Sequence, residues 1–165
     1  MFNIVATTTK DIPTIQEISS IVWPVTFSSI LSQEQIVYMM DMMYSTESLT
    51  RQMEEDQHNY VLIKDEENNY LGYLSYQLNI DNTYTKIHKI YVLPDLQRKG
   101  VGRALVGYAA DMAKAQGNKI LTLNVNRYNK ALGFYEHLGF SIAETVDINI
   151  GNGFLMEDYV LSMSL

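Results

Sequence analysis

Cysteine is absent from this chain of 165 residues. Its absence excludes disulfide bonds, thiolate zinc sites and any cysteine nucleophile or acyl-cysteine intermediate. Long apolar runs are missing too, and the N-terminal "MFNIVATTTKDIPT" lacks the basic and apolar regions of a signal peptide. We therefore expect a cytoplasmic protein that crosses no membrane, and we expect no metal site.

Positive charge is scarce, because 12 Lys and Arg residues face 19 Asp and Glu residues, for a formal net charge of -7. Nonspecific binding to nucleic acid or to an anionic membrane surface is therefore disfavoured on electrostatic grounds. An acidic surface suits a cationic partner, although the same charge also serves solubility alone. The hydrophobic content of 47% and the length predict one folded domain over residues 1–165.

The first part of the chain predicts helices. Apolar residues at helical spacing begin near Asp11, and Pro24 predicts that this helix ends near Trp23. A capping-box pattern at Ser32 predicts the start of a second helix, and a short third helix is predicted to begin near Ser45. Three helices are therefore expected before the first long strand.

From Tyr60 onward the apolar residues alternate with a period of two, which predicts strands. "YVLIKD" and "YLGYLSYQL" flank the turn-rich "EENN" and predict an antiparallel hairpin, and "TYTKIHKIYVL" predicts the next strand. A helix from Gly100 to Gln116, a strand "KILTLNVN", a short helix in "NKALGFYEHLG" and a strand pair around "GNG" follow. This order predicts an α/β (α+β) protein.

The segment "LPDLQRKGVGRALVGYAADMA" places two glycines and three cations at the start of a predicted amphipathic helix. A helix N-terminus exposes unpaired N–H groups and a partial positive charge, so it binds anions. Gly100 and Gly102 would let the backbone approach a ligand, and Arg98, Lys99 and Arg103 would add full positive charges. The segment therefore predicts a pyrophosphate-binding loop.

Two other glycine-rich phosphate loops are disfavoured. A P-loop needs a Gly-Lys-Ser/Thr ending, which "GVGRAL" does not contain. A dinucleotide-binding fingerprint needs a third glycine where Leu105 stands. The remaining alternative is that the glycines serve only a tight turn between a strand and a helix.

Two adjacent motifs resemble one known family. "IYVLPDLQRKGVGRALVGYA", with Gln97, Gly100 and Gly102 in a Gln/Arg-x-x-Gly-x-Gly/Ala pattern, resembles the acetyl-CoA-binding motif of the GNAT N-acetyltransferase superfamily. "KILTLNVNRYNKALGFYEHLGF" resembles the strand and helix that follow in that superfamily, so the resemblance covers residues 84 to 140. The N-terminal "VWPVTFSSILSQEQIVYMMDMMYSTESLTRQM" is similar, more loosely, to bacterial polyamine (spermidine/spermine) acetyltransferases.

The resemblance implies both a fold and an activity. The GNAT fold is a mixed, mostly antiparallel sheet of about six to seven strands, splayed in its middle and flanked by about four helices. The implied activity is transfer of an acetyl group from acetyl-CoA to the primary amine of a small molecule, such as a polyamine, by direct attack in a ternary complex. Acetylation of a protein N-terminus or lysine and noncatalytic acyl-CoA binding are the alternatives. Relatives are often homodimers.

The same resemblance assigns cofactor contacts. The N–H of Val92 is implied to hold the developing oxyanion, and Val92 and Leu93 to pair with the pantetheine arm. Relatives often carry an asparagine where Tyr128 stands, so the neighbouring Asn126 and Asn129 could take over its cofactor contact or could serve the loop. The full set of expected cofactor residues is Val92, Leu93, Gln97, Arg98, Lys99, Gly100, Val101, Gly102, Arg103, Asn126 and Asn129.

Two residues are candidates for proton transfer. Tyr135 matches the superfamily tyrosine that protonates the leaving thiolate, although its spacing also fits a core aromatic residue. His88 is the candidate base for the acceptor ammonium, and a solvent-facing histidine is the alternative. Many relatives carry a glutamate hereabouts, whereas this chain has Lys86 and Lys89. The sequence therefore leaves the base in doubt.

Overall fold

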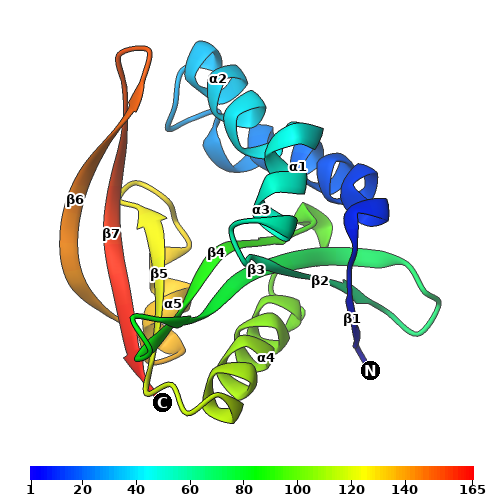
Figure 1. Cartoon of the computed structure of the whole chain (residues 1–165). Coiled ribbons are helices and arrows are strands. Elements are labelled where there is room, and N and C mark those ends of the chain that lie inside the picture. Colours follow the sequence, from blue (N-terminus) through cyan, green and yellow to red (C-terminus); the bar gives the residue numbers. More distant parts are fainter. The chain divides into compact units, whose positions relative to one another are not determined.

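The computed structural model describes all residues, 1–165, and its elements are drawn in Figure 1. Its strands form a seven-stranded sheet in the order β1-β2-β3-β4-β5-β7-β6. The pairs β1–β2, β2–β3, β5–β7 and β6–β7 are antiparallel and β4–β5 is parallel, which confirms the mixed, mostly antiparallel sheet. The elements are β1 Asn3–Ala6, η1 Thr9–Asp11, α1 Ile12–Phe27, α2 Gln33–Tyr44, α3 Thr46–Glu54, β2 Asn59–Lys64, β3 Tyr70–Ile80, β4 Tyr84–Val92, η2 Pro94–Leu96, α4 Val101–Ala115, β5 Ile120–Asn126, α5 Leu132–His137, β6 Ser141–Gly151 and β7 Phe154–Ser164.

Contacts between residues divide the chain into two compact units. The first unit comprises Met1–Gln77 and His88–Tyr108, and the second comprises Leu78–Ile87 and Ala109–Leu165. The chain passes from one unit to the other within β3, within β4 and within α4. Neither unit is a continuous segment, and the single domain over residues 1–165 stays a prediction.

The first helix is longer than the sequence predicts. Helix α1 continues through Pro24 to Phe27, so the expectation that it ends near Trp23 is wrong. Proline has a helical φ and removes only one hydrogen bond, and the Ser28 N–H still donates to the Pro24 carbonyl at 3.2 Å. The Trp23 and Phe27 rings are both buried with their centroids 4.4 Å apart, and this packing holds the last turn in place.

The second and third helices begin where their caps predict. The Ser32 hydroxyl accepts a hydrogen bond from the Gln35 N–H at 3.1 Å, and the Ser45 hydroxyl accepts one from the Ser48 N–H at 3.1 Å. Helices α1, α2 and α3 contact one another in the first unit, and they are the blue to cyan coils of Figure 1. No helix of the protein is both long and apolar enough to span a bilayer.

The hairpin of β2 and β3 forms as predicted, around a turn held by one side chain. Asp65 Oδ1 accepts the N–H groups of Glu67 and Asn69, both at 2.9 Å. Strand β1, which the sequence analysis does not predict, pairs with β2 from Asn3↔Lys64 to Ala6↔Val61. Its four residues are too few to show a period of two.

Gly72 permits a close approach between β3 and the end of β4. A Cβ atom built on Gly72 would lie 2.3 Å from the Tyr91 carbonyl oxygen, far inside van der Waals contact. Beside it, the Leu93 N–H donates to the Leu71 carbonyl at 2.9 Å. The missing side chain of Gly72 therefore helps to set the course of the chain at Val92 and Leu93.

In the second unit, the parallel pairing of β4 and β5 is short. It joins Tyr84–Ile87 to Ile120–Leu123, although β4 continues to Val92 and β5 to Asn126. A sheet that splays in its middle requires such a limited pairing. Leu121, Leu123 and Leu161 form the centre of the apolar core of this unit.

A buried asparagine fixes the turn after α4. Gly117 has φ +77, as expected for the residue that ends the helix. The next residue, Asn118, is 3% exposed, and its Oδ1 accepts the Asn79 N–H at 3.1 Å and the Thr85 hydroxyl at 2.6 Å. The buried amide is thus hydrogen-bonded to both strands that it meets.

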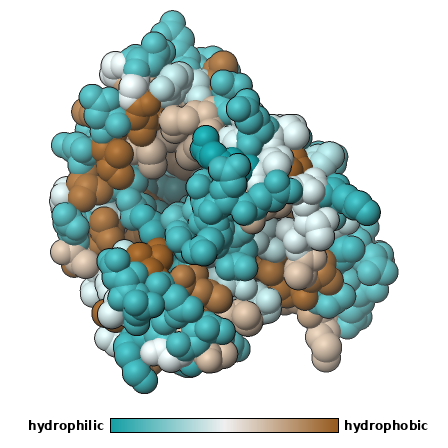
Figure 2. Space-filling model, in the orientation of Figure 1, coloured by the Kyte–Doolittle hydropathy of each residue, from teal (hydrophilic) through white to brown (hydrophobic).

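Strands β6 and β7 form a long hairpin of 11 residues each. Gly151, Asn152 and Gly153 all have positive φ, which confirms the turn predicted from "GNG". Figure 2 shows hydrophobic residues interspersed with hydrophilic ones over this hairpin. Ile142 and Leu155 are each 45% exposed. Isolated exposed apolar residues of this kind are common on protein surfaces.

Candidate active site

The predicted anion loop has the backbone that such a site needs. Arg98 and Gly100 have φ +69 and +85, and this left-handed geometry turns the chain into α4, which begins at Val101. The helix bond from the Ala104 N–H to the Gly100 carbonyl, at 3.0 Å, is the first of the ladder. The N–H groups of residues 101–103 therefore have no partner within the helix.

The three cations of the loop are available to a ligand. Arg98, Lys99 and Arg103 are exposed, and none of them forms an ion pair with an acid of the protein. Positive side chains around a free helix N-terminus fit a pyrophosphate group such as that of coenzyme A. The loop region therefore brings together backbone donors and charge in the combination expected for the predicted cofactor.

Other predicted cofactor residues are more constrained. Val101 is 2% exposed, so its side chain belongs to the core and only its backbone could meet a ligand. Gln97 is exposed and its N–H donates to the Pro94 carbonyl at 3.3 Å. The Leu93 N–H donates to the Leu71 carbonyl and the Leu93 carbonyl accepts the Leu96 N–H, both at 2.9 Å, so a pantetheine arm could pair only with the second lone pair of that carbonyl.

The two asparagines after β5 act within their own loop. Asn126 Oδ1 accepts the Tyr128 N–H and Asn129 Oδ1 accepts the Ala131 N–H, both at 2.9 Å. Each side chain thus closes an Asx turn. Only the Nδ2 groups of Asn126 and Asn129 remain to contact a cofactor.

Tyr135 lies in α5 of the second unit with its ring in the apolar core. It is 7% exposed, and the rings of Phe134 and Phe140 lie edge-on to it at 5.1 and 6.0 Å. Burial alone raises the pKa of Tyr135 above its ordinary value. Tyr135 is therefore a core aromatic residue whose phenol keeps its proton at neutral pH, and its role as the acid stays a prediction.

His88 lies in the first unit, stacked on a second histidine. The rings of His58 and His88 have centroids 3.9 Å apart and planes 14° apart. His88 Nε2 also lies 3.0 Å from Gln77 Oε1 in a hydrogen bond. His88 is half-buried rather than solvent-facing, and one of its ring nitrogens is already engaged.

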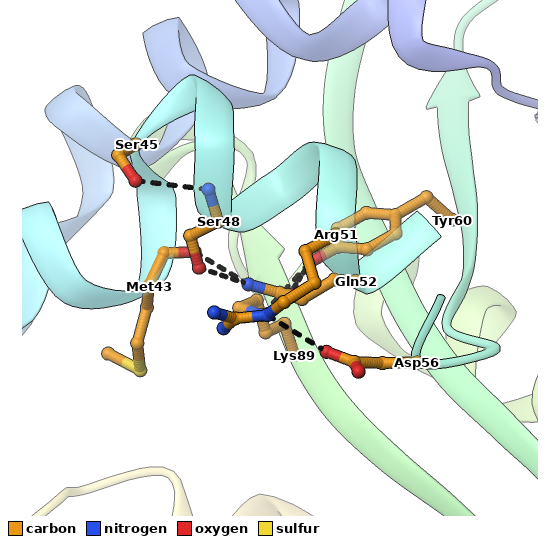
Figure 3. Close-up of polar contacts among 8 residues, drawn as sticks. All are labelled: Met43, Ser45, Ser48, Arg51, Gln52, Asp56, Tyr60 and Lys89. Atoms are coloured by element: carbon orange, nitrogen blue, oxygen red, sulfur yellow. Dashed lines mark hydrogen bonds and ion pairs between the residues drawn. The ribbon is translucent and has the colours of Figure 1, made fainter. Parts of the chain in front are cut away.

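A buried lysine that the sequence analysis did not single out lies on the same strand. Lys89 is 8% exposed, and its ammonium group donates to Gln52 Oε1 and, at 2.9 Å, to the Tyr60 hydroxyl. The Tyr60 hydroxyl donates to Gln52 Oε1 at 2.6 Å, and Gln52 Nε2 donates to the Ser48 hydroxyl at 2.9 Å. Figure 3 shows this cluster between α3, β2 and β4.

The hydrogen-bond partners of Lys89 are neutral, so no negative charge offsets the burial of its ammonium group. Its Nζ lies 5.5 Å from the ring centroids of Tyr44 and Tyr60, and no carboxylate pairs with it. Burial lowers the pKa of Lys89 to about 7. The alternation of "KIHKIYV" could have shown this, because a period of two places Lys89 with the apolar Ile87 and Tyr91.

A small cavity of about 200 Å³ also lies in the first unit, and it contains none of the predicted cofactor residues. It is smaller than the pockets of roughly 300 to 1,000 Å³ that hold small-molecule ligands. No group of three or more His, Asp or Glu side chains in the protein has the arrangement of a metal site. The cavity is lined by Ala6, Thr7, Met53, His58, Asn59, Tyr60, Val61, Tyr76 and Tyr108.

The chain is similar in sequence to known N-acetyltransferases. The spermidine N(1)-acetyltransferase of Thermoplasma acidophilum is 26% identical over 152 residues, which are 90% of this chain and 91% of that protein. An uncharacterised N-acetyltransferase of Methanocaldococcus jannaschii is 44% identical over 62 residues, which are 37% of this chain and 27% of that longer protein. The chain therefore spans about a quarter of the latter relative.

Solved structures show the same fold. The PaiA N-acetyltransferase of Thermoplasma acidophilum, in complex with coenzyme A, superimposes with a TM-score of 0.81 at 20% identity over 100% of this chain and 99% of its own. The model of the acetyltransferase (GNAT) domain family matches residues 28–162. This match confirms the predicted family, enzyme class and cosubstrate: the chain belongs to the GNAT family of acetyl-CoA-dependent N-acetyltransferases.

Proposed function

We propose that the protein transfers an acetyl group from acetyl-CoA to the primary amine of a small cationic molecule, of which a polyamine is the first candidate. The observation that carries this proposal is the likeness to a spermidine N(1)-acetyltransferase over 90% of the chain. A span of that length must include α2 and α3, which lie outside the cofactor motif. The net charge of -7 supports a cationic acceptor.

Under this proposal, the residues predicted from the sequence divide the work of the reaction. The N-terminus of α4, with Arg98, Lys99 and Arg103, would hold the pyrophosphate, and the Val92 N–H would donate to the developing oxyanion. Tyr135 would donate a proton to the leaving thiolate. A thiol has a pKa of about 8.5 and a phenol one of about 10, so the phenol is protonated when the thiolate forms.

The experiment that tests this proposal measures release of free CoA from acetyl-CoA with a panel of polyamines, aminoglycosides, amino acids and peptide amines, with the products identified by mass. We expect acetylated polyamine. Acetylation of peptide amines alone would replace the small-molecule proposal with a protein acceptor. Tight binding of acetyl-CoA without transfer to any amine would contradict the proposed reaction.

Two variants test the assignments of residues. Tyr135→Phe is expected to lower kcat about 100-fold while acetyl-CoA binding is kept, and unchanged turnover would reject Tyr135 as the acid. Gly102→Val is expected to block acetyl-CoA binding in calorimetry. Its matched control is Gly107→Val on the same helix, where a Cβ meets nothing within 4 Å. Equal binding by both variants would reject the loop assignment.

A further inference from the structure

The second unit contains a polar face on which two residues, Asn124 and Asp158, have no role in the predicted site. The sheet register pairs Lys86 of β4 with Thr122 of β5, and Asn126 of β5 with Asp158 of β7. Directly paired residues point to the same side of a sheet, as do residues two apart on one strand. Asn124, between Thr122 and Asn126, therefore shares this face with Lys86 and Asp158.

Asp158 is the buried acid of this face. It is 4% exposed, and Asn124 Nδ2 donates to its Oδ2 at 3.4 Å. The other end of the same amide, Asn124 Oδ1, is buried and accepts no hydrogen bond. A buried acceptor without a donor loses the hydrogen bonds that it makes with water in the unfolded chain, which destabilises the fold. The face therefore holds two adjacent buried acceptors, a carboxylate and an amide oxygen, and the protein supplies no donor for the second.

Burial and the surrounding charges act in opposite directions on the pKa of Asp158. Burial raises the pKa of Asp158, whereas the Asn124 amide and the charges of Lys86 and Arg127 oppose this rise. Lys86 forms no direct ion pair, and Arg127 is held by Asp147 at 2.7 Å and Glu157 at 3.5 Å. Neither Lys86 nor Arg127 therefore forms an ion pair with the Asp158 carboxylate.

A group that suits these two acceptors carries several N–H donors and a positive charge, which describes a primary ammonium. We propose that Asp158 and Asn124 receive the protonated amine of the acceptor, and that Asp158 takes its proton. The proposal rests on the proposed acetyl transfer. It assigns to a β7 carboxylate the task that many relatives give to a glutamate near Lys86, whereas His88 is stacked on His58 and hydrogen-bonded to Gln77.

The proton balance of the step is as follows. The acceptor R–NH3⁺ gives one proton to the Asp158 carboxylate and becomes R–NH2. Its nitrogen lone pair forms the C–N bond to the acetyl carbonyl carbon, the C–S bond breaks, and the electron pair leaves on sulfur. The thiolate gains a proton from Tyr135, the attacking nitrogen loses a second proton that restores the Tyr135 phenol, and Asp158 releases its proton to solvent. The net products are R–NH–CO–CH3, CoA–SH and one H⁺.

Asp158→Asn tests the proposal with a change that keeps the shape of the side chain and an acceptor for Asn124 Nδ2. The assay follows kcat/KM for spermidine at saturating acetyl-CoA from pH 6.5 to 9.5, values chosen because an alkylammonium has a pKa of about 10. We expect a loss of about 100-fold at pH 7. The variant without a base can use only spermidine whose amine is already deprotonated, and this fraction rises about tenfold per pH unit below the amine pKa. The difference in kcat/KM between the wild type and the variant is therefore expected to shrink about tenfold per pH unit.

The comparison variants separate a catalytic role from a structural one. Asp111→Asn, an equal charge change at an exposed position of α4, is expected to match the wild type. Asn124→Leu is expected to raise KM for spermidine more than it lowers kcat. An Asp158→Asn deficit that is the same at every pH would overturn the proton-transfer role, and so would activity within threefold of the wild type.

His88→Gln is the competing arm of the test. If its deficit, rather than that of Asp158→Asn, shrinks as the pH rises, the base is His88 and the proposal is wrong. Failure of the proposed function looks different, because the wild type would then acetylate no amine although acetyl-CoA binds. In that case calorimetry with spermidine decides, since equal affinity of the wild type and Asp158→Asn would also overturn the amine-receiving role.

Discussion

Two lysines three residues apart on β4 have different surroundings. Lys89, in the first unit, is 8% exposed and donates only to neutral groups of Gln52 and Tyr60. Lys86, in the second unit, is half-buried and faces the carboxylate of Asp158. Burial lowers the pKa of both, but only for Lys86 does a carboxylate oppose the shift. The charge state of a buried lysine thus depends on its partner as well as on its depth.

The largest expected effect on the pH dependence of stability comes from Lys89→Met, because the pKa of Lys89 is shifted more than that of Lys86. The pKa of Lys89 is about 7 in the folded protein and 10.5 in the unfolded chain, so the unfolded state binds more protons between these values. The contribution of Lys89 to the free energy of unfolding therefore rises with pH, by up to about 1.4 kcal/mol per unit. This pH-dependent contribution reaches its full value above pH 10.5, and it is lost as the pH falls to about 7.

Urea unfolding of the wild type and Lys89→Met between pH 6 and 9.5 checks this prediction. The difference between the two free energies is expected to be constant below pH 7 and to move in favour of the wild type above it. The buried tyrosines cancel in this difference, since both proteins contain them. Parallel curves over the whole range would contradict a depressed pKa for Lys89.

The next effect comes from giving Lys89 the kind of partner that Lys86 has. Gln52→Glu places a carboxylate where Gln52 Oε1 accepts from the Lys89 ammonium. An adjacent carboxylate favours the charged amine and raises its pKa by about 1–3 units. In the wild type, the free energy of unfolding is expected to rise with pH from about pH 7. In Gln52→Glu, this rise is therefore expected to start at a higher pH. Unfolding curves with an unshifted onset would show that burial alone sets the charge of Lys89.

A smaller effect is expected from Lys86→Met, which removes the cation near Asp158. The charge of Lys86 lowers the pKa of Asp158, so its loss raises that pKa further above the unfolded value. A raised folded pKa of an acid costs stability as the pH rises through it. Lys86→Met is therefore expected to lose roughly 1 kcal/mol or less between pH 4 and pH 7 relative to the wild type. In an Asp158→Asn background this pH-dependent loss is expected to vanish, and its persistence would exclude the pair.

The smallest effect is expected at the exposed edge of the Lys89 cluster, where Figure 3 shows Arg51 beside Asp56. Their side chains are 57% and 43% exposed and lie 3.4 Å apart. An exposed ion pair contributes little and is screened by salt. Arg51→Ala is expected to change the free energy of unfolding by less than about 0.5 kcal/mol, and less in 1 M salt. If Arg51→Ala lowered the free energy of unfolding as much as a substitution of the buried Lys89 does, exposure would not explain the difference between the two sites.

Local patterns explain what the sequence could predict. The turn into α4 at Gly100, the helix starts at Ser32 and Ser45 and the "GNG" hairpin each depend on neighbouring residues, and the structure contains all of them. That the turn into α4 binds an anion stays a prediction. Pro24 predicts a helix end that the structure does not have, because the packing of Trp23 against Phe27 stabilises the turn beyond it. The sequence does not predict β1, because only the pairing with β2 makes this segment a strand.

The polar groups of the interior were harder to predict. Lys89, Gln52 and Tyr60 come from three different elements, and no spacing along the chain joins them. Asp158 stands beside Glu157 in "MEDYV", and only the pairing of β7 with β5 shows that Asp158 is the buried one. The relevant information lies in contacts between distant residues.

Gly72 leaves no room for gradual change at its own position. The Tyr91 carbonyl oxygen occupies the space that a Cβ atom on Gly72 would need. Every other amino acid carries that atom, so any substitution of Gly72 must displace the backbone at Tyr91 and Val92. The course of the chain at the end of β4 is therefore open to abrupt change at Gly72, but not to adjustment by small steps in side-chain size.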